Sequence, residues 1–153
     1  FQDIMTLLKN STAVFAEENH IRLEMDMHCR DSVLTDKHYF LLSVFRNLLT
    51  NALEACESKE SSISFVQDSD GENYIFTVTD NGPGIPKENL ADIFTPGFST
   101  KINFDTGEIN RGLGLNLVKD VIENQLSGTI SVVSSPGCTK FTVCIPKNKL
   151  EVQ

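Results

Sequence analysis

The chain has 153 residues, of which 40% are hydrophobic and 22% charged, and its formal net charge is −8. This length and composition are typical of one globular domain with its own core, so we expect a single domain over residues 1–153. The acidic balance disfavours a nucleic-acid or anionic-membrane surface, because both would repel the protein. The sequence contains no apolar run of membrane-spanning length and no signal peptide.

The four cysteines show no CxxC spacing, which favours reduced thiols in or near the core of a cytosolic protein. They are Cys29, Cys56, Cys138 and Cys144. The chain begins with Phe1 rather than Met, so we expect it to be a piece of a longer protein.

The first part of the chain predicts a helix, a strand and a second helix. An amphipathic pattern covers Asp3 to about Asn19, and apolar and polar residues alternate from Ile21 to Met27. The second helix covers Phe40 to Cys56, with Thr35 or Asp36 as its N-cap. Its predicted apolar arc consists of Leu41, Phe45, Leu48, Leu49, Ala52, Leu53 and Cys56.

Asn47 and Asn51 lie one turn apart, at the border of that apolar arc. Asparagine is a poor helix former, because its amide competes for backbone hydrogen bonds. An amide oxygen is a suitable ligand for a magnesium ion that already carries phosphate oxygens and water. The two residues therefore indicate either a metal-nucleotide site or hydrogen bonds to a neighbouring loop.

Alternation returns after this helix. It predicts two strands, Ser61–Gln67 and Asn73–Thr79, joined by a turn at Asp68–Gly71. A short helix is expected near Lys87–Asp92, followed by a long irregular stretch to Arg111.

A further helix is predicted from Leu113 to Leu126, with Leu117, Val118, Val121 and Ile122 on its buried side. Two final strands, Thr129–Ser134 and Lys140–Ile145, are joined by the turn Ser135–Gly137. Short turns between neighbouring strands favour antiparallel pairing. The order of elements therefore predicts an α+β domain, with a mixed, mostly antiparallel sheet covered on one face by helices.

The segment Asp80-Asn-Gly-Pro-Gly-Ile-Pro86 follows a predicted strand. Asp-Asn-Gly alone is typical of a hairpin turn, but a Pro-rich segment and a helix follow here. A carboxylate at a strand end accepts a hydrogen bond from an amino group, while the glycines allow a flat ligand to approach the backbone.

The segment Arg111-Gly-Leu-Gly-Leu115 opens the later helix. Such glycines let backbone N–H groups and the positive helix end face an anion, although a plain helix start explains this segment better when it is taken alone. The segment is neither a Walker loop nor a Rossmann fingerprint. The stretch before it, residues 93–110, has the length of a functional loop. Within that loop Lys101 is a candidate phosphate ligand or a solvated surface lysine.

Together these segments resemble the four nucleotide boxes of the GHKL superfamily, specifically the catalytic and ATP-binding domain of sensor histidine kinases. The boxes are Asn47–Ala52, Asp80–Gly84, Ile93–Lys101 and Arg111–Leu115, and they occur in the family's order. Gly-Phe-Ser-Thr-Lys101 is most similar to the citrate and dicarboxylate sensor branch. The resemblance implies a Bergerat fold, which is a two-layer α/β sandwich, with a nucleotide lid at about residues 95–111.

The resemblance also implies roles for individual residues. Asn51 would bind Mg²⁺, with Asn47 beside the metal and the phosphates of ATP. Asp80 would accept a hydrogen bond from the adenine amino group, and Thr139 would reach adenine through water. The other implied nucleotide-binding residues are Gly82, Gly84 and Ile85 near the ring, and Lys101, Arg111, Gly112, Leu113, Gly114 and Leu115 near the phosphates.

Two features depart from the family pattern. Glu54 and Ala55 stand where many members have a lysine and an aromatic residue, which leaves the phosphate charge to Lys101 or Arg111. The last box usually reads Gly-x-Gly-Thr-x-Phe, whereas Pro136–Phe141 keeps Thr139 and Phe141 but neither glycine.

Family members that hydrolyse ATP usually have a glutamate base four residues before the metal asparagine. That position is Asn47, whose amide cannot take a proton at neutral pH. A histidine nucleophile needs no such base, because neutral imidazole has a lone pair. His20, His28 and His38 lack the acidic neighbour of an acceptor box, so the acceptor is expected on another domain.

The resemblance thus predicts a cytoplasmic protein-histidine kinase half that uses Mg-ATP. Its partners would be an acceptor-histidine helical domain of the same kinase and a response regulator, with no nucleic acid. The isolated domain would be a monomer and the intact protein a homodimer. The alternatives are a nucleotide-sensing module without transfer activity, a GHKL ATPase in which Glu54 acts as base, and an anti-sigma-type serine kinase.

Overall fold

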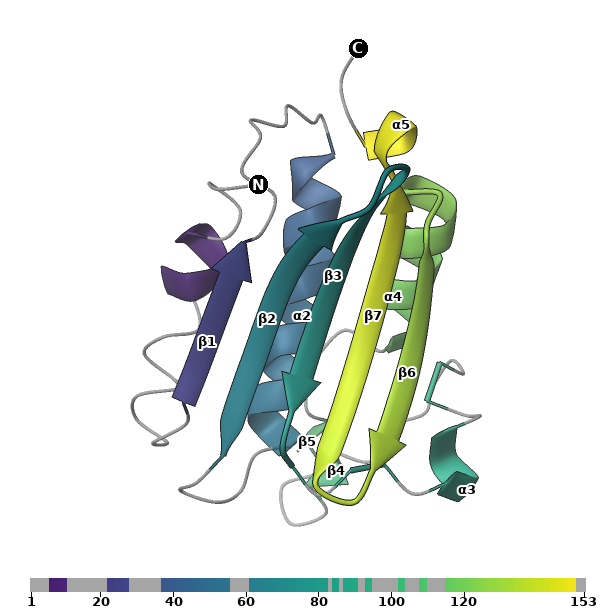
Figure 1. Ribbon diagram of the computed structural model, residues 1–153. Helices are drawn as coiled ribbons and strands as arrows, with labels where there is room; N and C mark the ends of the chain where they lie inside the picture. The colour runs from purple at the N-terminus through teal and green to yellow at the C-terminus, as the bar shows by residue number, and fades with distance from the viewer. Residues whose placement is uncertain are drawn as a thin grey trace.

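A computed structural model describes residues 6–10, 22–27, 37–55, 61–82, 84–85, 87–90, 93–94, 102–103, 108–109 and 115–150. Within these ranges the chain forms an α+β domain built on a five-stranded sheet (Figure 1). The predicted fold class is therefore confirmed.

The sheet has the order β1-β2-β3-β7-β6. Its strands are β1 (Arg22–Met27), β2 (Ser62–Ser69), β3 (Asn73–Asp80), β6 (Thr129–Ser135) and β7 (Cys138–Pro146). β1 runs parallel to β2, and the other neighbouring pairs are antiparallel. The parallel pair follows from the long connection through a helix, whereas tight turns join β2 to β3 and β6 to β7.

The helices are α2 (His38–Ala55), α3 (Lys87–Leu90), α4 (Leu115–Asp120) and α5 (Lys147–Leu150), and residues 6–10 are also helical. α2 and α4 lie on one face of the sheet, whereas α5 lies at the end of β7 and α3 lies beside the end of β6 (Figure 1). α2 contacts β2, β3 and α4, so it is the central helix of this layer. A separate two-stranded sheet pairs β4 (Ile102–Asn103) with β5 (Glu108–Ile109).

The core forms where α2 meets the sheet. Phe45 of α2 packs against Phe65 of β2 and Phe76 of β3, with ring centroids 5.2 and 4.5 Å apart. The predicted apolar arc of α2 is buried at Leu41, Phe45, Leu48, Leu49, Ala52 and Leu53, whereas Cys56 lies outside the described residues. The sheet is buried at alternate residues, as its period of two requires.

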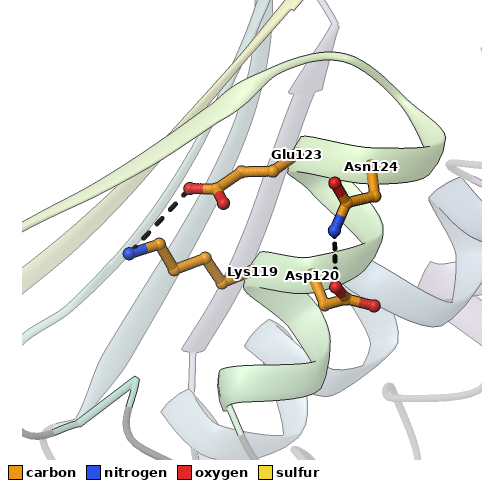
Figure 2. Close-up of polar contacts among 4 residues, drawn as sticks. All are labelled: Lys119, Asp120, Glu123 and Asn124. Atoms are coloured by element: carbon orange, nitrogen blue, oxygen red, sulfur yellow. Dashed lines mark hydrogen bonds and ion pairs between the residues drawn. The ribbon is translucent and has the colours of Figure 1, made fainter.

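The predicted helix at Leu113–Leu126 is α4 followed by a π-helix, η1 (Val121–Gln125). The Leu126 N–H donates to the Val121 carbonyl, five residues earlier, which widens the last turn. Its outer surface carries two contacts at i,i+4 spacing (Figure 2). Lys119 pairs with Glu123 at 3.9 Å, and the Asn124 amide donates to Asp120.

Two predicted burials are wrong. Leu117 was expected on the buried side of its helix, but it is 46% exposed. The buried stripe passes through Val118 and Ile122, and Leu117 lies about 100° around the helix from Val118. Cys138 was expected in or near the core, but it is exposed because it directly follows the β6–β7 turn. Cys144 is half-buried, as expected.

Among the helices whose residues are described, none has both the length and the hydropathy required to cross a bilayer.

Candidate nucleotide site

Four predicted site segments meet at one end of the sheet (Figure 1). β3 ends there, the β6–β7 turn lies there, and the C-terminal half of α2 and the first turn of α4 approach the same end. α2 contacts both β3 and α4 directly. The fold thus gathers segments that are far apart in the sequence.

Asp80 is the last residue of β3 and is only 5% exposed. Its position continues the inward-facing row of β3, which until this point is apolar: Tyr74, Phe76 and Val78. Its Oδ1 accepts the Gly82 N–H at 3.0 Å, so the carboxylate also shapes the turn that leaves the strand. A buried carboxylate at the end of an apolar row is a strong hydrogen-bond acceptor for a ligand amino group.

Thr139 of β7 is the register partner of Asp80 and is 4% exposed. Its hydroxyl Oγ1 lies 2.9 Å from Oγ of Ser134, which is in turn the register partner of Thr139 on β6. Asp80, Thr139 and Ser134 therefore form one polar row across three adjacent strands. This row lies at the end where the predicted nucleotide segments meet.

The loop after β3 packs directly on the end of β6. The Ile85 N–H donates to Ser134 Oγ at 2.8 Å. Gly84 has a φ of +86°, and a Cβ atom at this position would lie 2.5 Å from the Ser135 carbonyl oxygen. Gly84 is therefore required by backbone conformation and by the close approach of β6, independently of any ligand. Ile85 is half-buried and packs against the core.

Asn47 and Asn51 lie half-buried on α2, at the border between its apolar and polar arcs. The Asn47 side-chain N–H donates to the Ser43 carbonyl at 2.7 Å. Since the amide nitrogen is held by the helix backbone, Oδ1 is the Asn47 atom directed away from that bond. Amide oxygens at this position fit a hard cation such as Mg²⁺.

No group of three or more His, Cys, Asp or Glu side chains suited to a metal occurs in the described part of the chain. The amide oxygens of Asn47 and Asn51 are donors of the kind that Mg²⁺ binds together with phosphate oxygens and water.

Phe94, within the predicted phenylalanine box, is held by two neighbours. Its ring lies edge-on to Phe141 of β7, with centroids 6.5 Å apart. The Lys119 ammonium lies 5.4 Å from the centroid of the same ring. These contacts tie the start of the long predicted loop to β7 and α4.

Several predicted site residues lie outside the described ranges. They are Lys101, Arg111, Gly112, Leu113 and Gly114, together with most of the predicted lid. Leu115 begins α4 and is half-buried. Ser134 was not predicted as a site residue from the sequence. The feature that could have identified it is a polar residue that continues the inward-facing apolar residues Ile130 and Val132 of β6.

Residues 36–149 match the family described as histidine kinase-, DNA gyrase B- and HSP90-like ATPase. The sensor protein CitS of Halalkalibacterium halodurans is 33% identical over 144 residues, covering 88% of this chain and 25% of CitS. The sensor histidine kinase DcuS of Escherichia coli K12 is 36% identical over 126 residues, covering 81% of this chain and 22% of DcuS. The chain thus spans about a quarter of the length of these relatives.

Solved structures show the same fold. The catalytic domain of histidine kinase ThkA superposes with a TM-score of 0.82 at 24% identity, covering 97% of this chain and 95% of that domain. ThkA has also been solved in complex with the response regulator TrrA, with a TM-score of 0.80 at 21% identity, covering 97% of this chain and 41% of ThkA. The predicted resemblance to sensor-kinase catalytic domains is confirmed, and the chain belongs to the family of histidine kinase-, DNA gyrase B- and HSP90-like ATPases.

Proposed function

We propose that the chain binds Mg-ATP and donates its γ-phosphoryl group to a histidine on a separate helical acceptor domain. The observation that supports ATP binding is the buried pair formed by Asp80 and Thr139, at the end of the sheet where α2 and α4 converge. The carboxylate would accept the adenine N6–H, and the Thr139 hydroxyl would complete the contact with the ring directly or through water.

Other residues of this chain would hold the phosphates and the metal. The amide oxygen of Asn51 would bind Mg²⁺ and Asn47 would lie beside it, while Lys101 or Arg111 would neutralise the outer phosphate. Gly112 to Leu115 would lie under the phosphates. Mg²⁺ would neutralise charge on the phosphate oxygens, so that protein groups need mainly to position the reactants.

In the transfer step, the lone pair of a neutral imidazole nitrogen on the acceptor forms a bond to the γ-phosphorus. The bond between that phosphorus and the β,γ-bridging oxygen breaks, and ADP leaves. The acceptor is proposed to lie outside this chain, because His20, His28 and His38 do not have an acceptor-box sequence.

Sequence identity to CitS and DcuS supports a place in two-component signalling. By analogy with the ThkA–TrrA complex, the partner that receives the phosphoryl group next would be a response regulator. We further propose that the intact protein is a homodimer with this domain in the cytoplasm, and that the isolated domain is a monomer.

A nucleotide-sensing module without transfer activity is the second candidate. Two features favour it: the position of Glu54 has no lysine, and the segment Pro136–Phe141 lacks both glycines that are usual in the last box. An ATPase is disfavoured because Asn47 stands where a water-activating glutamate is needed.

Phosphotransfer to an added acceptor distinguishes these candidates. The chain is incubated with radiolabelled Mg-ATP, with and without a dimeric acceptor-histidine domain from a sensor kinase of the CitS or DcuS type. Acid-labile label on the acceptor, together with slow hydrolysis in its absence, is the expected result. Tight ATP binding without transfer would favour the sensing module. Rapid hydrolysis abolished by Glu54→Gln would favour the ATPase.

A further inference from the structure

The Ser134 hydroxyl joins two segments of the proposed adenine site. Its Oγ accepts the Ile85 N–H at 2.8 Å and lies 2.9 Å from Thr139 Oγ1. One side chain on β6 thus contacts both the loop after β3 and the start of β7. The packing of Gly84 on the Ser135 carbonyl adds a second contact between the same loop and β6.

The hydroxyl proton of Ser134 can take one of two directions. The Cys138 carbonyl lies 3.4 Å from Oγ, whereas Thr139 Oγ1 lies at 2.9 Å. Thr139 can instead donate across the same contact, and the Ser134 proton then has only the Cys138 carbonyl, at a distance that is long for an O–H···O hydrogen bond. A ligand that accepts from Thr139 would select the other arrangement, in which Ser134 donates to Thr139. Since a hydroxyl has one proton and two acceptor lone pairs, Thr139 then keeps its own proton for a ligand.

This direction of donation has a consequence for base recognition. Asp80 acts as acceptor and Thr139 as donor, and the two are register partners. Adenine offers the complementary pattern, an N6–H donor next to the N1 acceptor. Guanine offers the opposite pattern, an O6 acceptor next to the N1–H donor. The polarity of Thr139 therefore matters to the choice of base.

We propose that Ser134 is a positioning residue for adenine, which orients the Thr139 hydroxyl as a donor and holds the Gly84–Ile85 segment on β6. This inference rests on the proposed function, because it assigns a role within the ATP site. Ser134 itself need not touch the nucleotide.

The test is calorimetric titration of this chain with ATP and with GTP. Ser134→Ala should weaken ATP binding by about two- to twelvefold, the equivalent of one lost neutral hydrogen bond. GTP binding should change little, so the preference for ATP falls by a similar factor. Ser134→Thr keeps the hydroxyl and should restore the preference. Ser131→Ala is the matched control, because Ser131 is an exposed serine on the same strand.

Amide hydrogen exchange provides a readout that needs no nucleotide. Ser134→Ala should accelerate exchange at Ile85, since its N–H loses its acceptor. If Ser134→Ala does not fold, Ser134→Cys is used instead and the same results are expected, because a thiol has a similar shape to a hydroxyl but forms only weak hydrogen bonds.

An unchanged ATP preference in Ser134→Ala, or equal weakening of ATP and GTP, would overturn the positioning role and leave only packing. A wild-type chain that binds neither nucleotide would overturn the proposed function and the inference together. Ile85 exchange would then still show whether Ser134 holds the loop.

Discussion

Asp80 and Thr139 face each other across the antiparallel strands β3 and β7, and each side chain is at least nine-tenths buried. Every other buried residue of β3 on this face is apolar, as are the buried residues of β7 beyond Thr139. On β3 and β7 the inner face therefore changes from apolar to polar in a single row. Burial strengthens the hydrogen bonds of such groups, which supports the proposal that adenine is recognised at this row.

Removing the charge of Asp80 should weaken ATP binding. Asp80→Asn keeps an oxygen that can accept the Gly82 N–H but replaces the carboxylate by an amide. Loss of a hydrogen bond to a charged acceptor is worth about 1.5–3 kcal/mol, or about a ten- to 150-fold loss of affinity. Titration calorimetry measures this change, with Asp26→Asn on the exposed face of β1 as control. Unchanged affinity in a folded Asp80→Asn variant would contradict the adenine role.

Periodicity predicted most of this fold from the sequence. The apolar arc of α2 and the alternation of β2 and β3 are strong signals, because each element packs one face against a single core. Asp80 was found for the same reason: it is a charged residue at the end of an alternating strand. Asn47 and Asn51 stood out because asparagine is unfavourable inside a helix.

The remaining features depend on contacts between distant segments. Ser134 looks like an ordinary strand serine until Ile85 and Thr139 are placed beside it. The π-helix at Val121–Gln125 and the exposure of Leu117 likewise depend on how one helix packs against β6 and α2. A single helical period cannot predict a change of pitch within the helix.

Asn51→Ala should weaken binding of Mg-ATP by about tenfold or more, while metal-free ATP binding changes much less. The reason is that the substitution removes the amide oxygen proposed to bind the metal. The measurement is ATP titration in magnesium and in a chelator. Thr50→Ala, a substitution at the neighbouring half-buried residue, is the control. Equal weakening in both solutions would indicate that Asn51 acts through helix packing.

Asp70 should make stability depend on pH. Its Oδ1 accepts the N–H groups of Glu72 and Asn73 at 2.8 and 2.7 Å. These hydrogen bonds, the one from Glu72 first, hold the pKa of Asp70 below its ordinary value of 3.8. The folded state therefore favours the carboxylate. The resulting stabilisation is present above that ordinary value and is lost as the pH falls through the lower pKa of the folded state.

Asp70→Asn tests this charge, because the amide oxygen can still accept both N–H groups. Wild type should have the larger free energy of unfolding near neutral pH, and the difference should disappear in strong acid. Urea unfolding across the acid range measures both curves. A difference that persists unchanged in strong acid would mean that the shape of the turn, rather than the charge, is responsible.

Gly84 and Gly137 allow backbone strain and close packing to be separated. Both have a φ of +86°, but a Cβ atom on Gly84 would lie 2.5 Å from the Ser135 carbonyl oxygen, whereas Gly137 has nothing within 4 Å. Gly137→Ala should therefore lower the free energy of unfolding only by the cost of placing alanine in a left-handed conformation, about 1–2 kcal/mol. Gly84→Ala should lower the free energy of unfolding by about 1–3 kcal/mol more, because the loop or β6 must move to accommodate the Cβ atom.

The shift of the loop or β6 in Gly84→Ala should also make the two variants differ in ATP affinity. Displacing the loop from β6 disturbs the segment between Asp80 and Ile85, so ATP affinity should fall in Gly84→Ala and stay near wild type in Gly137→Ala. Thermal unfolding and ATP titration of both variants provide the comparison. If the two alanine variants lose equal stability and equal affinity, then backbone conformation alone explains Gly84, and the contact between the loop and β6 has no role in the site.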